Sequence, residues 1–470
     1  MLEWLHRLFN PRSVAVVGAS ERAGTVGRAV LENLLATFKG EILPVNYKYD
    51  SVLGLRCYRS VRDLPKAPDL AVLAVPAGST PEVVRDLCGL GTRVSIVVSA
   101  GFKETGPEGA KLEAELVSAA RSCGMRILGP NCLGVYDPWS GLDTIFNPND
   151  RQAKPGAGGV AFLSQSGALG AAILDWLAEA GIGLSKFVSY GNAADIKEWE
   201  LVEYLAEDPR TTVIAMYVEG VEDGRRFMES VRKAVARSKP VVVLKGGKTE
   251  AGGRAATSHT GSLAGRGEVF ASAVRQAGAV TVDGLGELIS VLKLFARGMI
   301  PKGRRVGIVT NGGGAGVLAV DSVESLGLDL ARLAASTTEQ LRRVLPPAAS
   351  TSNPVDILGD APPERYAAAV EAVANDPNVD SVIVIALMQS PAFDPRKFAE
   401  LIKGVRGLRG KPVALVAPGG SYTVEHSREL EKELSVPYYR TPEEAVRALK
   451  LAVEWYEKYM SMKGTGSFQV

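Results

Sequence analysis

Ser13-Val14-Ala15-Val16-Val17-Gly18-Ala19-Ser20 is the stretch that decides the fold of the N-terminal region. Residues 14–17 are continuously apolar, which predicts a buried strand, and the turn at Gly18-Ala19-Ser20 leads into a helix expected over 27–39. Short apolar runs separated by helical stretches then recur at 41–45, 70–75, 94–98 and 126–128. This alternation predicts a parallel, doubly wound sheet, and such sheets bind ligands at the carboxyl ends of their strands.

The residues at these strand ends favour a ligand that carries phosphate. The turn from Gly18 to Gly27 is longer than the GxGxxG dinucleotide fingerprint. The second strand is followed by Asn46 and Lys48, where an NAD site usually offers an acid to the ribose. A cation there suits a nucleotide with an extra phosphate, such as the 3′-phosphate of coenzyme A or the 2′-phosphate of NADP. A solvated lysine without a ligand is the alternative.

A second α/β region begins with an expected strand over 160–163, which runs directly into Ser164-Gln165-Ser166-Gly167 and a helix. Hydroxyls and free N–H groups at such a helix start point at an anion, and the helix dipole adds to the attraction. A plain N-cap by Ser164 or Ser166 is the alternative. A later strand, over 212–218, is followed by Glu219, and we expect its carboxylate at the same ligand-binding edge.

The stretch RAATSHTGSLAG, residues 254–265, contains the histidine with the strongest case for chemistry. The chain has histidines at 6, 259 and 426, and only His259 lies among small, polar and glycine residues. The glycines on both sides predict a loop that can move or approach a ligand closely. A neutral imidazole is a nucleophile and a base near neutral pH, so we expect Glu219 and His259 to face each other. An incidental surface histidine is the alternative.

A third α/β region repeats the strand, glycine loop and helix pattern. The expected strand 305–310 runs into Asn311-Gly312-Gly313-Gly314, which again suits an anion held on main-chain N–H groups. Two such loops and a loop histidine in one chain favour a phosphoryl site. Polar segments rich in proline and glycine separate the regions. The predicted parts are a Rossmann-like domain (1–146), two flavodoxin-like domains (156–297 and 303–460) and a tail (461–470).

Composition narrows the functional classes. The 470 residues carry 54 basic and 52 acidic side chains. This balance gives no excess of positive charge that would favour binding to nucleic acid or a membrane surface. No apolar run approaches the roughly 20 residues of a membrane span. The four cysteines, Cys57, Cys88, Cys123 and Cys132, have no metal-ligand spacing, so we expect reduced thiols, no metal site and a cytoplasmic location. Abundant Arg, Glu and Lys with little Gln are typical of a thermophile.

Taken in this order, the motifs resemble the alpha subunit of the ADP-forming acyl-CoA synthetases, the acetate–CoA ligases of archaea. They are more distantly similar to the alpha subunit of succinyl-CoA ligase. The resemblance covers about residues 10–458. It implies a CoA-binding domain, a ligase domain with a phosphohistidine, and a third domain.

The resemblance also implies roles for individual residues. Ser-His-Thr-Gly makes His259 the phosphorylated histidine, and Glu219 matches the acid that orients it. The phosphate-facing helix starts would be formed by Ser164, Ser166 and Gly167 and by Gly313 and Gly314. The positions that would line coenzyme A are Gly18, Ala19, Ser20, Lys48, Pro76, Ser99 and Asn131.

The implied reaction is acyl-CoA + Pi + ADP ⇌ acid + CoA + ATP, through an acyl phosphate and the phosphohistidine. Such ligases need an ATP-grasp module, and the sequence contains neither a P-loop nor a region long enough for that module. The resemblance therefore implies a separate beta subunit that binds ADP or ATP and Mg²⁺, in an α2β2 heterotetramer. The glycine-rich loop would carry His259 between the acyl site and the nucleotide site.

Other classes of function stay open from the sequence. The chain could be a non-catalytic CoA-binding or regulatory protein, or a subunit of the succinyl-CoA ligase type. It could also be the ligase-like part of a protein acetyltransferase, although no acetyltransferase domain follows. A nicotinamide dehydrogenase is disfavoured by the Gly18 turn and Asn46.

Overall fold

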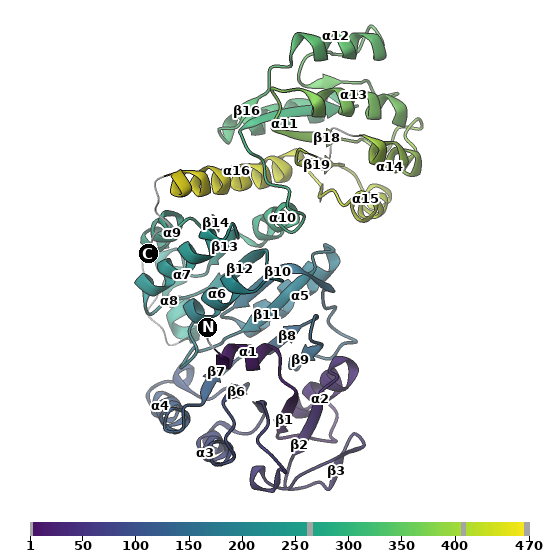
Figure 1. Cartoon of the computed structure of the whole chain (residues 1–470). Coiled ribbons are helices and arrows are strands. Elements are labelled where there is room, and N and C mark those ends of the chain that lie inside the picture. The colour runs from purple at the N-terminus through teal and green to yellow at the C-terminus, as the bar shows by residue number, and fades with distance from the viewer. Residues whose placement is uncertain (1–2, 261–266, 406–409, 465–470) are drawn as a thin grey trace. The chain divides into compact units, whose positions relative to one another are not determined.

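The computed structural model describes residues 3–260, 267–405 and 410–464 and divides the chain into two compact units, Met1–Asp283 and Gly284–Val470. The first unit contains two mainly parallel sheets and a short hairpin, and the second unit contains one parallel sheet, with helices around the sheets as Figure 1 shows. The α/β class expected from the sequence is confirmed.

The first sheet has the strand order β2-β1-β5-β6-β7, and all its pairings are parallel. Its central strands are mainly apolar, and Val14, Ala15 and Val16 are fully buried. The order reverses between β1 and β5, which is where doubly wound sheets open a crevice. The strands are β1 (Ser13–Val17), β2 (Glu41–Val45), β5 (Leu70–Leu73), β6 (Val94–Val97) and β7 (Arg126–Leu128). The helices and the remaining hairpin are α1 (Glu3–Phe9), α2 (Val26–Thr37), β3 (Ser51–Val52), β4 (Leu55–Arg56), η1 (Val61–Asp63), η2 (Ala77–Ser79), α3 (Thr80–Leu90), η3 (Lys103–Thr105) and α4 (Pro107–Arg121).

The second sheet has the order β14-β13-β12-β10-β11-β8-β9 and belongs to the same unit. Its first five strands are parallel, and β8 adds to β11 in the antiparallel direction. The strands are β8 (Gly134–Asp137), β9 (Leu142–Asp143), β10 (Ala157–Ser164), β11 (Leu184–Ser189), β12 (Val213–Val218), β13 (Val241–Lys245) and β14 (Val280–Val282). The helices are α5 (Gly167–Glu179), α6 (Glu198–Glu207), α7 (Gly224–Ala236), α8 (Glu250–Thr260) and α9 (Gly267–Gln276). Because β8 and β9 precede residue 146, the expected first domain contributes two strands to the second sheet.

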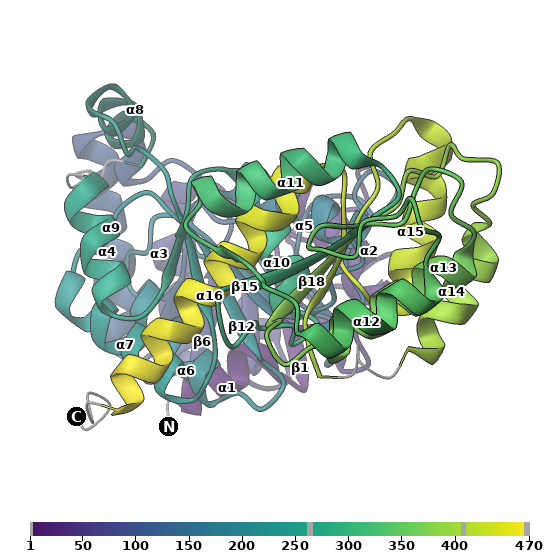
Figure 2. The ribbon, with the colours of Figure 1, turned by 90° about the horizontal axis from the view of Figure 1, so that it is seen from above.

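The second unit contains the third sheet, with the order β16-β15-β18-β19-β20 and β17 paired to β15. Helix α16 packs against α10 and α11, and Figure 2 shows α11 and α16 side by side. The strands are β15 (Arg305–Thr310), β16 (Asp329–Leu330), β17 (Val355–Asp356), β18 (Ser381–Ile385), β19 (Val413–Val416) and β20 (Tyr438–Tyr439). The helices are α10 (Leu285–Phe295), α11 (Gly313–Ser325), α12 (Ala335–Val344), α13 (Pro363–Asn375), α14 (Pro395–Gly404), α15 (Ser421–Leu434) and α16 (Pro442–Gly464).

Side-chain hydrogen bonds determine where α6 begins. Its first residue is Glu198, and Glu200 Oε2 accepts from Lys197 N–H at 3.0 Å. Asp195 accepts from Arg126 Nε at 2.8 Å and from Ile127 N–H at 3.0 Å. The last helix continues to Gly464, so it includes residues 461–464 of the expected tail, and residues 465–470 lie outside the described part.

The expectation of four reduced thiols is wrong. Cys88 and Cys123 form a disulfide with a Cα–Cα distance of 5.8 Å, while Cys57 and Cys132 are free and buried. Packing of α3 against α4 brings the two half-cystines together, which no spacing in the sequence reveals. No helix within residues 3–260, 267–405 and 410–464 is long and apolar enough to cross a membrane.

Candidate functional site

Gly18 lies at the strand-order reversal of the first sheet. It follows β1 with φ +96°, and its N–H donates to Val45 O at 2.9 Å. A Cβ atom on Gly18 would lie 2.3 Å from Ala74 O, and one on Gly27 would lie 2.0 Å from Gly18 O. Only glycine permits this close passage of strand, turn and helix. The turn therefore leaves a cradle of bare main chain at the carboxyl edge of the sheet.

Asn46 fixes the turn at the end of β2. Its Nδ2 donates to Ala19 O at 2.7 Å, and its Oδ1 accepts from Lys48 N–H at 3.0 Å. The amide thus binds both sides of the turn, a role that the sequence did not reveal. The Lys48 side chain is exposed, with Nζ 5.4 Å from the centre of the Tyr47 ring. It can reach a ligand phosphate at this edge, and its role stays a prediction.

The other residues predicted to line coenzyme A lie at the same edge. Ser20 is buried and its Oγ accepts from Arg22 N–H at 3.0 Å, while Pro76 is exposed after β5. Ser99 Oγ donates to Val75 O, and Ser99 O accepts from Asn131 N–H at 2.9 Å. Hydrogen bonds therefore connect the ends of β5, β6 and β7 into one line of loops.

The loop at Asn131 joins this line to the second sheet. Asn192 N–H donates to Pro130 O at 2.9 Å, and Asn131 Nδ2 lies 3.3 Å from Asn192 Oδ1. A Cβ on Gly191 would lie 2.3 Å from Asn131 O. Leu133 N–H donates to Ser189 Oγ at 2.9 Å. The segment after β7 and the segment after β11 are therefore held against each other.

Helix α5 begins beside the same segment. Ser166 is its N-cap, and Ser166 Oγ accepts from Leu169 N–H at 3.3 Å. Ser164 is fully buried and its Oγ donates to Ser166 O at 2.6 Å, so this hydroxyl shapes the turn. A Cβ on Gly167 would lie 3.5 Å from Leu133 Cβ, in ordinary contact. The helix start, with its partial positive charge, thus lies next to the loop of Asn131.

Glu219 follows β12 and is held from several sides. Its main-chain N–H donates to Gln165 Oε1 at 2.7 Å, and its carbonyl accepts from Lys245 Nζ at 2.7 Å. Its carboxylate Oε1 accepts from Tyr217 OH at 3.2 Å. The side chain of Gln165, one residue before the N-cap of α5, thus connects the helix start to Glu219, whose residue exposure is 6%.

Burial shapes the electrostatics around Glu219. Burial of Lys245 lowers the pKa of its ammonium group, although the Glu219 charge opposes this effect. Burial raises the pKa of the Tyr217 phenol, and the Glu219 charge and hydrogen bond raise it further. Burial likewise raises the pKa of Tyr190, whose OH donates to Tyr217 O at 3.3 Å. Both phenols therefore stay protonated and act as donors at neutral pH.

His259 lies in helix α8, not in the loop that the glycines predicted. Thr249 starts this helix, because its Oγ1 accepts from Gly252 N–H at 3.1 Å, and Glu250 pairs with Arg254 at 2.9 Å. A cap and an i,i+4 ion pair thus offset the poor helix propensity of the glycines. Helix α8 lies against η3 of the first sheet's loops. The His259 side chain and residues 261–266 are outside the described part, so the predicted contact with Glu219 stays a prediction.

Gly313 and Gly314 begin α11 in the second unit. The helix has Gly312 as its N-cap without a side-chain cap, and Gly312 N–H donates to Thr310 Oγ1 at 3.0 Å. A Cβ on Gly313 would lie 3.1 Å from Asp356 Oδ2. The turn is the expected strand–glycine–helix arrangement, and its phosphate contact stays a prediction.

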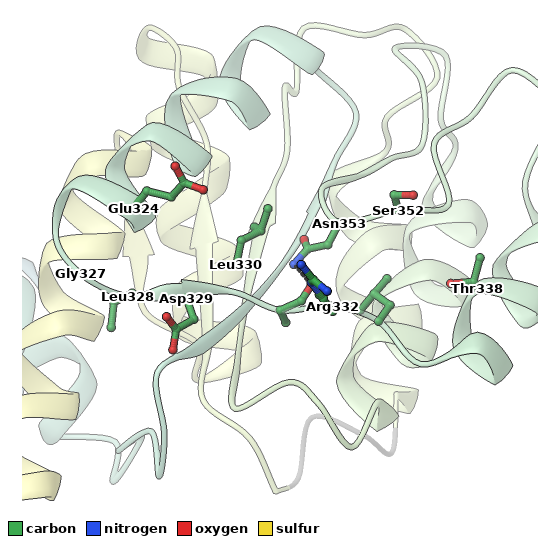
Figure 3. A pocket seen from close by; sticks show the side chains of 11 residues that line it. Glu324, Gly327, Leu328, Asp329, Leu330, Arg332, Thr338, Ser352 and Asn353 are labelled. Carbon is green, nitrogen blue, oxygen red and sulfur yellow. Dashed lines mark hydrogen bonds between the residues drawn. The ribbon is translucent and has the colours of Figure 1, made fainter.

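A pocket of the second unit lies elsewhere, along the edge strand β16. Figure 3 shows Glu324, Asp329, Arg332 and Asn353 among its lining residues. Its volume is about 790 Å³, and it contains none of the predicted site residues. Among the residues that the structure describes, no group of three His, Cys, Asp or Glu side chains could hold a metal ion.

Comparison with known proteins identifies the family. Three family models match: a CoA binding domain over 12–138, a succinyl-CoA ligase like flavodoxin domain over 157–295 and a ligase-CoA domain over 306–459. The alpha subunit of acetate–CoA ligase [ADP-forming] II from Pyrococcus furiosus is 41% identical, over 96% of this chain and 97% of that protein.

Two further relatives agree. Acetate–CoA ligase [ADP-forming] I from Archaeoglobus fulgidus is 41% identical over 95% of this chain, which spans 63% of that protein. An acetyl-coenzyme A synthetase 1 from Candidatus Korarchaeum cryptofilum, solved in complex with phosphate and ADP, aligns with a TM-score of 0.91. That match has 36% identity and covers 98% of each chain. The chain therefore belongs to the family of ADP-forming acetate–CoA ligase alpha subunits.

Proposed function

We propose that this chain is the alpha subunit of an enzyme that converts acyl-CoA, phosphate and ADP into the free acid, CoA and ATP. The observation that carries the proposal is the continuous link from the Gly18 cradle, through the Asn131 loop, to the start of α5 and Glu219. A thioester held along this line would bring its carbonyl to a phosphate at the helix start.

The first step would form an acyl phosphate. A phosphate oxygen attacks the thioester carbonyl, the C–S bond breaks, and the CoA thiolate takes up a proton. The N–H groups at the start of α5 and the partial charge of the helix favour a bound dianion there. Ser166 supports this role by fixing the first turn through Leu169 N–H.

The second step would move the phosphoryl group to His259. The imidazole nitrogen attacks phosphorus, the P–O bond to the acyl group breaks, and the carboxylate leaves. The Glu219 carboxylate would fix the tautomer of the imidazole and stabilise the positive charge that develops. Phosphoryl transfer depends mainly on such positioning and charge stabilisation.

The third step needs a nucleotide site on a partner. The Pyrococcus furiosus relative is named as a subunit, whereas the Archaeoglobus fulgidus relative is not, and this chain spans only 63% of it. We therefore assign the ADP and Mg²⁺ site to a beta subunit with an ATP-grasp domain, in an α2β2 complex in the cytoplasm. ADP attacks the phosphohistidine there, the P–N bond breaks, and ATP forms.

The test is phosphorylation of the chain by acetyl-CoA and ³²P-labelled phosphate, with and without the beta subunit. We expect an acid-labile label on the wild type, ATP synthesis only with the partner, and no label on His259→Asn although CoA still binds. Binding of CoA without any label, even with the partner present, would instead support a non-catalytic CoA-binding protein.

A further inference from the structure

The Tyr217 phenol forms a hydrogen bond with the Glu219 carboxylate. Both residues come from the end of β12, two positions apart, so their side chains leave the chain on the same face of the sheet. Tyr217 OH donates to Glu219 Oε1 at 3.2 Å. This hydrogen bond restricts rotation of the carboxylate about its last side-chain bond. No motif in the sequence marks Tyr217, because it reads as the last aromatic residue of a buried strand.

The phenol is itself held in one place. On one side, a Cβ atom on Gly246 would lie 2.5 Å from Tyr217 Oη and 3.0 Å from Cζ, so the ring edge packs on bare main chain after β13. On the main-chain side, Tyr217 O accepts from Gln165 N–H at 3.1 Å and from Tyr190 OH at 3.3 Å. The main chain of Tyr217 is therefore held by residues after β10 and β11, while its ring packs against the residue after β13.

Two other hydrogen bonds hold the main chain of Glu219. Gln165 accepts from its N–H, and Lys245 donates to its carbonyl. These bonds place the Cα atom, whereas the bond from Tyr217 acts on the carboxylate itself. The Tyr217 phenol supplies a side-chain donor to the carboxylate. Because burial keeps this phenol protonated, it stays a donor throughout the neutral pH range.

We propose that Tyr217 is a positioning residue for phosphoryl transfer, which acts by fixing the orientation of the Glu219 carboxylate. The inference rests on the proposed function. It extends that function to Tyr217, which would act through Glu219 and not on the substrate. A hydrogen bond to a charged group in a buried site has a large effect when it is removed. Tyr217→Phe is therefore expected to slow phosphorylation of the chain about 10- to 100-fold, with the KM for acetyl-CoA unchanged.

A double-mutant cycle separates positioning from a general structural role. If Tyr217 acts through Glu219, then Tyr217→Phe should have almost no further effect on the rate once Glu219 is replaced by Gln. If the phenol only supports the fold, the two losses should multiply. The rates are measured by rapid quench with acetyl-CoA and labelled phosphate, using the full chain with its beta subunit.

Three further variants test whether a slow rate reflects misfolding. Gly246→Ala places a methyl group against the phenol oxygen and should reproduce the slow rate, whereas Gly286→Ala in α10 meets open space and should not. Tyr136→Phe removes another buried phenol, whose OH donates to Pro155 O at 2.8 Å on the far side of the same sheet. It should lose stability without losing rate.

The outcomes are distinct. A wild-type chain that is never phosphorylated would overturn the proposed function itself. A wild-type chain that is phosphorylated normally, together with a Tyr217→Phe variant at the same rate or a cycle with multiplying effects, would overturn only the role of Tyr217.

Discussion

Gln165 accepts two hydrogen bonds through one oxygen, from the main-chain N–H groups of Glu219 at 2.7 Å and Gly220 at 3.0 Å. Gln165 lies between β10 and the N-cap of α5, so this side chain connects the predicted phosphate site to the predicted orienting acid. The two strand ends are neighbours in the sheet, since β10 pairs with β12.

Replacement of Gln165 by Leu should therefore damage stability and rate together. Two N–H groups would lose their acceptor, and at 1–3 kcal/mol for each unsatisfied group we expect a loss of roughly 2–6 kcal/mol in the free energy of unfolding. Phosphorylation of His259 should also slow, because Glu219 would no longer be anchored. Denaturant unfolding and the labelled-phosphate assay measure the two effects.

Gln152→Leu is the matched control. Gln152 is similarly buried and its Nε2 donates to Ala171 O at 2.8 Å, away from the strand ends. It should lose stability at a normal rate of phosphorylation. A Gln165→Leu variant that is destabilised but as fast as the wild type would show that this connection has no part in the chemistry.

Lys48 tests the position of the nucleotide end of coenzyme A. Lys48→Glu should weaken CoA more than 3′-dephospho-CoA, because the lost contact is with the 3′-phosphate, a charge-assisted pair. Lys39→Glu makes the same charge change at an exposed residue after α2, near the opposite edge of the sheet, and should leave both affinities unchanged. Isothermal titration of the wild type and both variants gives the six dissociation constants, and equal weakening of both ligands by Lys48→Glu would place the phosphate elsewhere.

The sequence predicted the central strands and their ends well, for a physical reason. A strand buried on both faces of a parallel sheet reads as a continuous apolar run, so β1, β15 and the end of β12 at Val218 were placed to within a residue. Edge strands of two residues, such as β16 and β20, have no periodicity to detect. They form because longer neighbours offer them a partner.

The site was only partly predictable. Positions with positive φ or close main-chain contacts, such as Gly18, can be predicted because glycine is the residue that tolerates them. Asn46, Gln165 and Tyr217 act through hydrogen bonds that depend on the register between strands, which one sequence does not contain. The helix at His259 was missed for the opposite reason, since glycine-rich composition argues against a helix that Thr249 nevertheless caps.

The disulfide offers a direct test of the first sheet's packing. Cys88 and Cys123 close a loop with a sequence separation of 35 residues, which corresponds to roughly 3–4 kcal/mol in the chain-entropy model. The Cys88→Ser, Cys123→Ser double variant should melt at a lower temperature than the wild type, and reductant should lower the melting temperature of the wild type alone. The Cys57→Ser variant, which removes a free thiol, serves as the control. Identical melting of wild type with and without reductant would show that the thiols are unpaired in solution.

Glu198 should make the stability of the chain depend on pH. It is 3% exposed at the start of α6, and its Oε1 is a buried oxygen without a hydrogen-bond partner. Burial raises the pKa of this carboxyl from 4.5 to about 7, with Lys197 lowering it and Glu222 and Glu200 raising it slightly. Between these two values the folded chain binds a proton that the unfolded chain has lost, so stability falls as the pH rises from about 4.5 to about 7 and then levels off. This rise in pKa corresponds to a loss of about 3 kcal/mol in the free energy of unfolding above pH 7.

Glu198→Gln removes the charge that burial disfavours. The variant should therefore be more stable than the wild type at pH 8, by up to about 3 kcal/mol, and close to it at pH 4.5. Denaturant unfolding across this range measures the difference. Glu207→Gln, which replaces an exposed carboxylate at the other end of the same helix, should change stability by less than about 1 kcal/mol at either pH. A Glu198→Gln variant that is less stable than the wild type at pH 8 would show that the carboxylate is ionised there and held by a favourable partner.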